Sequence, residues 1–342
     1  MKTVQLPQNH PSGLKQVRFG RSRPKPGFPR FRLSRYMVRT ALPAPPASVD
    51  YSPDAAASLS NVYLNQELGC CVIAGGFHVI GVETGNATGG TPWVATNDQV
   101  IAQYSAIGGY VPGNPATDQG CDEVTAMNYW TSTGFPDGSK LLGWLEVDAT
   151  NQLEMQTALD LFEDLLFGIE LPDAYVDPFP SGNGFTWDVA GDPVAANGHC
   201  IIGCGYDSTG IKVDTWGMLG TMTWAAVAKY CVPSAGGALY VLLSQDEIGK
   251  GASVCPNGID WSTLLNDFNA MGGNVQVPAS PPAPSPAPSP APNPDGSVSL
   301  AQATAWATSG FAGRYIFTQD QAVATATSGL SANWPTASKP KS

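Results

Sequence analysis

The feature that most constrains this 342-residue chain is an ordered set of four reactive side chains. Asn65 precedes Cys71 by six residues in the segment Asn-Gln-Glu-Leu-Gly-Cys-Cys. Far downstream, His199 opens the run His-Cys-Ile-Ile-Gly-Cys-Gly-Tyr, and Asp214 follows in Ile-Lys-Val-Asp-Thr-Trp-Gly. In this order an amide, a thiol, an imidazole and a carboxylate supply an oxyanion donor, a nucleophile, its base and the group that orients the base. The chain is therefore expected to fold so that two distant segments meet at a thiol.

Cys71 is the predicted nucleophile. A thiol reacts as its thiolate, which a helix N-terminus and a neighbouring imidazolium both stabilise. The apolar stretch 71–81 predicts a buried helix with Cys71 on its first turn, after a sharp turn at Gly69. Gly75 and Gly76 each weaken a helix by about 1 kcal/mol against Ala. We interpret them as sites of close packing against a sheet.

The chain contains three histidines, and only one fits the role of the base. His10 lies in a polar, proline-containing leader. His78 follows Cys71 by seven residues, about 10 Å along a helix axis, so we interpret it as a packed or capping residue. His199 remains as the base, and its alternative is a strand histidine with its hydrogen bonds satisfied.

Asp214 is expected to hold the imidazole of His199 and to favour its charged form. If Ser208 and Thr209 form a tight hairpin turn, Asp214 faces Gly203. The alternation of side chains then places Asp214 on the His199 face of the sheet. A strongly coiled strand or a bulge would then be needed to bring the two side chains together.

Asn65 is the predicted oxyanion donor, acting beside the backbone N–H of Cys71. Two alternatives are a loop asparagine that caps its own backbone and the neighbouring Gln66 as the donor.

These residues resemble the papain-like cysteine peptidases. The family pattern has a Gln, a Cys six residues later at the head of the central helix, a strand His-Ala-Val-x-x-x-Gly-Tyr and then Ile-Lys-Asn-Ser-Trp-Gly. By this resemblance Cys71 is the nucleophile and His199 the base. Asp214 replaces the family Asn, Asn65 replaces the oxyanion Gln, and Val72 replaces the Trp that follows the nucleophile.

A closer resemblance is to divergent papain-like proteins of bacterial viruses and prophages. They carry Asn-Asp-x-x-Gly-Asp-Cys, a helix with a His, a segment similar to residues 110–121, and a Tyr-Trp pair as at Tyr129 and Trp130. Cys70 takes the Asp position of that pattern, so Cys71 stays the nucleophile. The resemblance covers residues 43–243. It implies an α+β, two-lobed papain-like fold, with a helical lobe and an antiparallel sheet lobe.

Four segments are expected along the chain. Residues 1–42 form a basic, Pro-rich N-terminal arm, 43–275 the papain-like domain, 276–296 a Pro-rich linker, and 297–342 a small Ala/Ser/Thr-rich tail module that docks on a partner or is disordered. Helices are predicted near 98–107, 121–132, 152–164 and 223–230, the third because its apolar residues recur at helical spacing. Strands are predicted at 165–171 and 238–243, and a peripheral helix within 246–268.

Charge is divided unevenly. Residues 1–50 hold ten of the 17 Lys and Arg but one of the 28 acidic residues, and the whole chain has a net charge of −11. We interpret the arm as a flexible basic segment that lies on its own acidic body. Nucleic acid or another acidic partner is the alternative. The arm also stands where papain-like enzymes carry an inhibitory leader, although the alternating aromatics of residues 28–37 are typical of an anchoring segment.

Several functional classes are not indicated. No segment has the apolar core of a secretion signal or the length of a membrane span, so we expect the cytoplasm of a bacterial host or a virion, without membrane insertion. The seven cysteines do not have metal-ligand spacing, and we expect mostly free thiols, no metal and no cofactor.

The ordered residues therefore predict a thiol hydrolase that cleaves peptide or isopeptide bonds in a peptide or protein substrate, and the resemblance implies an association with a phage or prophage. The alternative is a catalytically weak or inactive scaffold that serves as a virion structural or interaction protein through the arm or the tail. An acyl-transferase of transglutaminase type shares the order of Cys, His and Asp.

Overall fold

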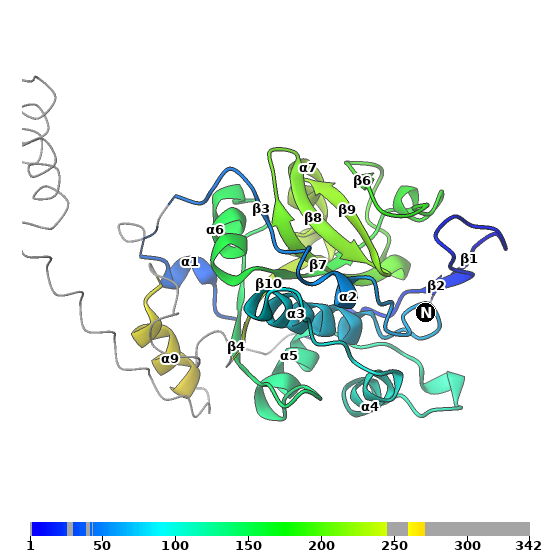
Figure 1. Cartoon of the computed structure of the whole chain (residues 1–342), viewed down its shortest axis with the longest axis horizontal. Helices are drawn as coiled ribbons and strands as arrows, with labels where there is room; N and C mark the ends of the chain where they lie inside the picture. The colour runs from blue at the N-terminus through cyan, green and yellow to red at the C-terminus, as the bar shows by residue number, and fades with distance from the viewer. Residues whose placement is uncertain (1, 26–29, 39–41, 43, 245–258, 271–342) are drawn as a thin grey trace, which may run out of the picture. The chain divides into compact units, whose positions relative to one another are not determined.

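A sheet of eight strands forms the centre of the described part of this computed structural model (Figure 1). The structure describes residues 2–25, 30–38, 42, 44–244 and 259–270, so the predicted linker and tail lie outside the described residues. The strand order is β4-β10-β5-β7-β8-β9-β6, and β3 pairs with β7. The strands are β3 (Val49–Asp50), β4 (Leu141–Glu146), β5 (Leu165–Glu170), β6 (Phe185–Trp187), β7 (Gly198–Tyr206), β8 (Gly210–Thr215), β9 (Met218–Thr223) and β10 (Ala238–Ser244). All neighbours are antiparallel except β6 and β9.

Helices cover both faces of this sheet and divide the apolar interior into two cores. One core lies under α3 and includes Leu166, Ile202 and Leu242, and the other packs α6 and α7 against Phe167, Ile201 and Val241. Side chains of one strand alternate between the two cores, as pleating requires. The α-helices are α1 (Leu33–Tyr36), α2 (Ala56–Leu59), α3 (Cys71–Thr88), α4 (Asn97–Gly108), α5 (Glu123–Ser132), α6 (Gln152–Phe162), α7 (Trp224–Tyr230) and α9 (Trp261–Ala270). Short 3-10 turns are η1 (Pro115–Thr117), η2 (Asp173–Tyr175), η3 (Ala195–Asn197) and η4 (Pro233–Ala235).

The predicted α+β class is confirmed. Helices α2 to α5 precede the sheet strands from β4 onward, and the four predicted helices coincide with α4, α5, α6 and α7 within a few residues. The described end of the expected peripheral helix is α9, whose Leu264, Leu265 and Phe268 are buried. No helix in the described part is long and apolar enough to cross a membrane.

Helix α3 is buried almost all round and runs along the sheet, which explains its continuous apolar sequence. A Cβ atom at Gly75 would press on Cys200 and Leu166 of the sheet, and one at Gly76 would overlap the indole of Trp130. These contacts confirm that the two glycines serve close packing, although Gly76 packs against α5.

The register between β7 and β8 differs from the expected one. Asp214 lies opposite Ile202, one residue away from the predicted Gly203, because the ladder is irregular between Gly203 and Tyr206. A shift of one residue moves a side chain to the other face of a sheet. The prediction that Asp214 shares a face with His199 is therefore wrong.

The N-terminal arm lies along the body within one compact unit (Figure 1). Strands β1 (Thr3–Gln5) and β2 (Gln16–Arg18) form an antiparallel pair. Further along the arm, Arg21 and Cys121 form an isolated parallel β-bridge. Acidic partners hold five arginines of the arm, in the pairs Arg18–Asp118, Arg21–Glu123, Arg23–Glu170, Arg30–Glu146 and Arg35–Asp267. These pairs confirm that the basic arm lies on its own acidic body.

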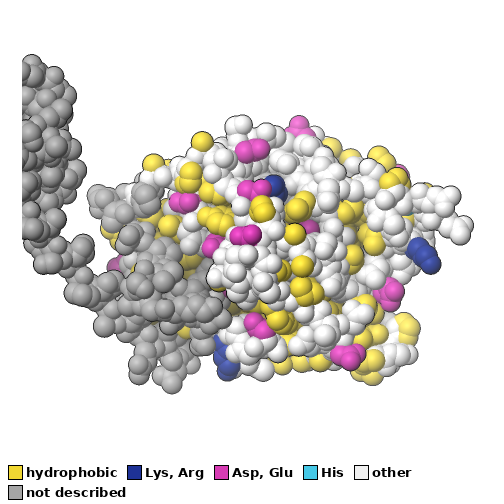
Figure 2. All heavy atoms as spheres, in the orientation of Figure 1, with side chains coloured by type: hydrophobic (Ala, Val, Ile, Leu, Met, Phe, Trp, Pro, Cys, Tyr) yellow, Lys and Arg dark blue, Asp and Glu magenta, His cyan; other side chains and the backbone are white. Residues whose placement is uncertain are grey.

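The anchoring segment of the arm is also confirmed in its described part. Phe31 meets Phe268 of α9 edge to face, and Leu33 and Tyr36 of the short helix α1 are buried. Figure 2 shows acidic side chains scattered over the visible face of the body, where Lys and Arg are sparse. The body thus keeps an acidic surface while the arm supplies much of the positive charge.

Candidate active site

Cys71 begins helix α3, with Cys70 at the N-cap position. Its thiol is buried, and backbone groups of Cys200 and Gly20 lie beside it and favour the thiolate. Burial outweighs them and raises the pKa of Cys71 to about 12. In this arrangement of the chain the thiol is therefore neutral near neutral pH.

His199 is the second residue of β7 and is buried among aromatic rings. Its ring stacks on Trp216 with centroids 3.8 Å apart, and Phe19 of the arm meets it edge on. Nε2 lies 2.8 Å from the hydroxyl oxygen of Thr215, while Nδ1 has no hydrogen-bond partner in the described structure. Burial lowers the pKa of His199 to about 3, so this imidazole is neutral.

The turn between β8 and β9 places Trp216 over the imidazole. Trp216 and Gly217 both have positive φ, at 50° and 74°, which is the pattern of a two-residue hairpin turn that follows strand twist. A bulky residue in this conformation costs on the order of 1–3 kcal/mol. The strain is located at the residue that fixes the His199 ring.

Asp214 does not contact His199 in the hydrogen bonds and ion pairs of the described residues. Its Oδ2 lies 2.8 Å from Nδ1 of His78 on α3, and Nε2 of His78 lies 2.9 Å from the carbonyl oxygen of Asn61. The one-residue register shift directs Asp214 towards α3, and Thr215, the next residue, takes the position beside His199. The expected orienting role of Asp214 is corrected accordingly, and His78 is a packed residue with a partner, as predicted.

Asn65 is buried and is hydrogen-bonded to the arm. Its Nδ2 donates to the backbone carbonyl oxygens of Arg18 and Leu68 at 3.3 and 3.1 Å, and the backbone carbonyl oxygen of Asn65 accepts from the N–H of Arg18 at 3.3 Å. The alternative donor, Gln66, has a buried side-chain oxygen without a hydrogen-bond partner. Both side-chain amides therefore lie in the loop that precedes α3, and the amide of Asn65 is hydrogen-bonded to the arm.

The arm covers both reactive groups. Phe19 packs on the ring of His199, and the backbone of Gly20 lies beside the thiol of Cys71. The carbonyl oxygen of Gly20 accepts from the N–H of Cys121, and a Cβ atom at Gly20 would overlap the carbonyl of Gly69. Only glycine fits where the arm crosses the thiol.

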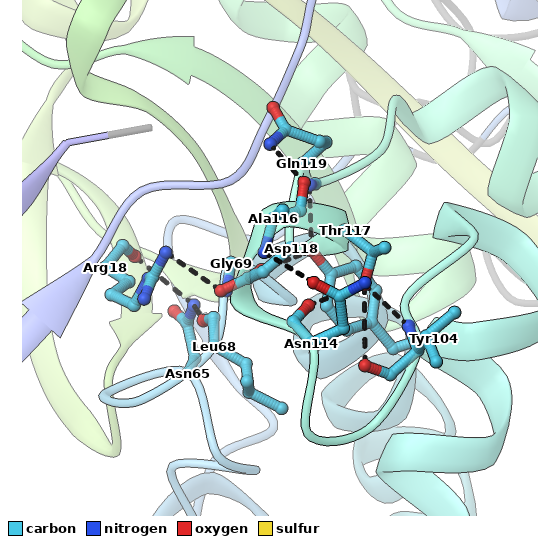
Figure 3. A network of polar contacts seen from close by, with 12 residues as sticks. Arg18, Asn65, Leu68, Gly69, Tyr104, Asn114, Ala116, Thr117, Asp118 and Gln119 are labelled. Atoms are coloured by element: carbon cyan, nitrogen blue, oxygen red, sulfur yellow. Dashed lines mark hydrogen bonds and ion pairs between the residues drawn. The ribbon is translucent and has the colours of Figure 1, made fainter.

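Asp118 ties the arm to the loop that precedes Cys71 (Figure 3). Its Oδ2 lies 2.9 Å from Nη2 of Arg18, and its Oδ1 accepts from the N–H of Gly69 at 3.0 Å and from the hydroxyl of Tyr104 at 2.6 Å. Burial and the neighbouring carboxylate raise the pKa of Tyr104. This network aligns the arm with the start of α3.

A cavity of about 520 Å³ opens beside this crossing. It is lined by Phe19, Gly20, Arg21 and Ser22 of the arm and by Gln119, Ala196 and Gly198 of the body, among others. The arm residues Phe19 and Gly20, which lie against His199 and Cys71, thus also form part of the wall of this cavity. No cluster of three or more His, Cys, Asp or Glu side chains that could hold a metal occurs in the described residues, and their six cysteines are free.

Sequence reasoning missed Thr215, Phe19, Asp118 and Glu123. Thr215 stands in the quoted Asp-Thr-Trp-Gly motif, where a correct register would have selected it. The other three depend on contacts between the arm and residues about 100 to 180 positions away, for which the sequence carries no local signal.

No protein-family model matches the sequence, and a comparison with curated proteins gives no match. Solved structures are similar at low identity. Xylellain, a cysteine protease from Xylella fastidiosa, is 15% identical, with a TM-score of 0.48 over 67% of this chain and 98% of that one. Procathepsin L2 proteinase from Tenebrio molitor larval midgut is 14% identical, with a TM-score of 0.43 over 58% and 68%. The Carica candamarcensis cysteine protease CMS1MS2 is 13% identical, with a TM-score of 0.39 over 58% and 98%.

Proposed function

We propose that this chain is a papain-like thiol hydrolase that cleaves peptide or isopeptide bonds, with Cys71 as the nucleophile and His199 as the base. One observation carries the proposal. The thiol at the N-terminus of α3 lies beside the backbone of Cys200, the residue that follows His199, and the arm covers thiol and imidazole together. Two reactive groups from distant segments thus lie under the same stretch of the arm.

The proposed reaction runs through an acyl-enzyme. The Nδ1 atom of His199 accepts the thiol proton, and the thiolate of Cys71 adds to the carbonyl carbon of the substrate. The tetrahedral intermediate collapses, the C–N bond breaks, and the imidazolium gives its proton to the leaving amine. Water, deprotonated by His199, then attacks the thioester and releases the acid and the free thiol.

Three neighbours support these steps in the proposal. In the proposed tautomer Nε2–H donates to the hydroxyl oxygen of Thr215, 2.8 Å away, and the Nδ1 lone pair is free for the thiol. Trp216 holds the plane of the ring. The backbone N–H of Cys71, with the side chain of Asn65 or Gln66 once the arm has left, stabilises the oxyanion.

The same proposal assigns the arm an inhibitory role. With Phe19 and Gly20 in place, burial keeps the thiol and the imidazole neutral, with pKa values of about 12 and about 3. Removal of the arm exposes both groups to water and allows the thiolate–imidazolium pair that catalysis needs. The arm-docked chain is therefore the resting form.

The test is cleavage of a peptide library by the full chain carrying Gly20→Ala, in which a Cβ atom displaces the arm from the thiol. We expect cleavage products from Gly20→Ala and none from Gly20→Ala combined with Cys71→Ala or with His199→Ala. A primary amine added to the reaction separates hydrolysis from acyl transfer of transglutaminase type. Absence of products at every peptide, in a folded variant with a released arm, would overturn the hydrolase.

A non-catalytic scaffold is the second candidate, because Cys71 and His199 are both buried and no hydrogen bond joins them in the described residues. We also propose a phage or prophage setting, supported by the resemblance of residues 65–130 to those proteins. Detection of the protein in purified particles tests the setting. Full infectivity of Cys71→Ala particles would favour the scaffold, and lost infectivity the enzyme.

A further inference from the structure

We propose that Glu123 forms the base of a pocket for an arginine side chain, and that the hydrolase selects peptides with arginine next to the residue that lies over Cys71. This inference rests on the proposed function and adds the chemical class of its substrate. In the resting form the occupant is Arg21 of the arm, which follows Gly20.

The arm is held at this point by its backbone as well as by its side chain. The N–H of Arg21 donates to the carbonyl oxygen of Gly198 at 3.1 Å. Cys121 donates to the carbonyl oxygen of Gly20 at 3.0 Å and accepts from the N–H of Ser22 at 3.1 Å. These bonds involve no side chain of the arm, so any extended peptide can make them. Side-chain selectivity must then come from the pocket under Arg21.

That pocket is built for a guanidinium. The side chains of Arg21 and Glu123 are exposed by only 1% and 0%, and Nε lies 2.7 Å from Oε1. Nη1 donates to the carbonyl oxygen of Gly236. At Gly168 of β5, a Cβ atom would overlap the Glu123 carboxylate and press on Nη2 of Arg21. The missing side chain at Gly168 therefore leaves the space that the guanidinium occupies.

Burial makes the pocket selective for a cation. Burial raises the pKa of Glu123, and the charge and hydrogen bond of Arg21 oppose this rise by favouring the carboxylate. A neutral side chain in this position would leave a buried carboxylate without a partner, which is strongly unfavourable. Lysine presents a single ammonium, whereas the fork of arginine reaches Glu123 and the carbonyl of Gly236 with separate N–H groups.

Arg18 and Arg23, which flank Arg21 in the arm, have more exposed side chains than Arg21. The side chain of Arg23 is 59% exposed although it is hydrogen-bonded twice to Glu170, and that of Arg18 is 24% exposed. Exposed pairs contribute little because water screens them. Arg21 is thus the matched position for a test, and Arg23 is its internal control.

The experiment measures peptide binding to the full chain carrying Gly20→Ala, Arg21→Ala and Cys71→Ala, in which the arm competes far more weakly than the native arm and no cleavage occurs. The probe is a fluorescent peptide of residues 16–24, made with arginine or with its neutral isostere citrulline at position 21 or 23. Citrulline at position 21 is expected to weaken binding about 30-fold or more. Citrulline at position 23 is expected to change it about 3-fold or less.

Equal affinity for arginine and citrulline at position 21 would overturn the pocket. Adding Glu123→Gln to the protein is expected to abolish the difference, and the peptide comparison alone decides the matter if that variant does not fold. The arginine pocket and the hydrolase are separate proposals, and the experiments can overturn either one alone. Arginine-selective binding by a chain whose Gly20→Ala form cleaves nothing supports the pocket and overturns the hydrolase, whereas cleavage without preference for arginine does the reverse.

Discussion

Gly20→Ala is expected to release the arm from the thiol while leaving the rest of the chain folded. The new Cβ atom overlaps the carbonyl group of Gly69, which belongs to the backbone and cannot rotate away. Overpacking of this kind costs about 1–3 kcal/mol. The ratio of docked to released arm should then fall by about 5- to 150-fold, because 1.36 kcal/mol corresponds to a factor of ten.

The assay is the rate of alkylation of Cys71 by iodoacetamide, followed by mass spectrometry. If the arm opens and closes faster than the thiol reacts, the rate rises in proportion to the released fraction. Buried Cys204 reports global unfolding within the same sample, since it is packed in the core under α3. Lys15→Ala, at an exposed position of the same arm, is the matched control.

A Cys71 rate that is unchanged in Gly20→Ala would refute the reasoning that the arm shields the thiol. Equal acceleration of Cys71 and Cys204 would also contradict it, because the variant would then act through unfolding of the whole domain. Selective acceleration of Cys71 is the expected result.

Four further predictions concern the site and the stability of the fold. Thr215→Val should lower the turnover of the arm-released enzyme about 10- to 100-fold by freeing the His199 ring, which steady-state kinetics measure. Asp214→Asn should lower the free energy of unfolding by about 3 kcal/mol through loss of the His78 pair, which urea unfolding measures. Acid should release the arm. The docked form holds one proton on the pair, because docking lowers the His199 pKa to about 3, and the released thiolate–imidazolium pair takes up a second proton once its thiolate is protonated, at a pKa of about 3.5–7.5. Below that pKa docking weakens by up to about 1.4 kcal/mol per pH unit, measurable as lost hydrogen-exchange protection of residues 18–22 after correction for intrinsic rates. Burial raises the pKa of Glu163 to about 7, so its ionisation destabilises the fold as pH rises from about 4.5 to 7. In urea unfolding, Glu163→Gln should therefore raise the free energy of unfolding by about 1–2 kcal/mol at pH 8 and by much less at pH 4.5. Equal effects of the substitution at both pH values would contradict this.

The sequence was sufficient for the α+β class and for most of the helices. Apolar spacing and capping residues act locally, and α4, for example, begins with a capping box between Thr96 and Gln99. The position of Cys71 at the start of α3 followed from the same local rules. Charge division also predicted where the arm lies, because ten basic residues precede an acidic body.

The face of the sheet to which each side chain of β7 and β8 points could not be predicted from local rules. Every residue of β7 is buried, so the strand shows no alternation of apolar and polar side chains that would fix its register. The irregularity between Gly203 and Tyr206 then decides which side chain meets His199, and it selects Thr215 over Asp214.

Long-range contacts explain the remaining differences. Asn65 stands six residues before the thiol, but its amide is engaged by the carbonyl of Arg18, which is 47 residues away in the chain. Glu123 is, in the sequence, an ordinary acidic residue in the first turn of a helix, and only folding buries it against Arg21. Such roles depend on which distant segments meet.

The central claim is that Cys71 and His199 act as one ionisable pair once the arm has left. The most direct measurement is the pH dependence of Cys71 alkylation in Gly20→Ala, compared with the same variant carrying His199→Ala. The account predicts a rate that persists well below pH 6, as expected of a thiolate stabilised by an imidazolium, and that is lost in acid when His199 is replaced. A single ionisation near or above about 8.5 in both variants would contradict it.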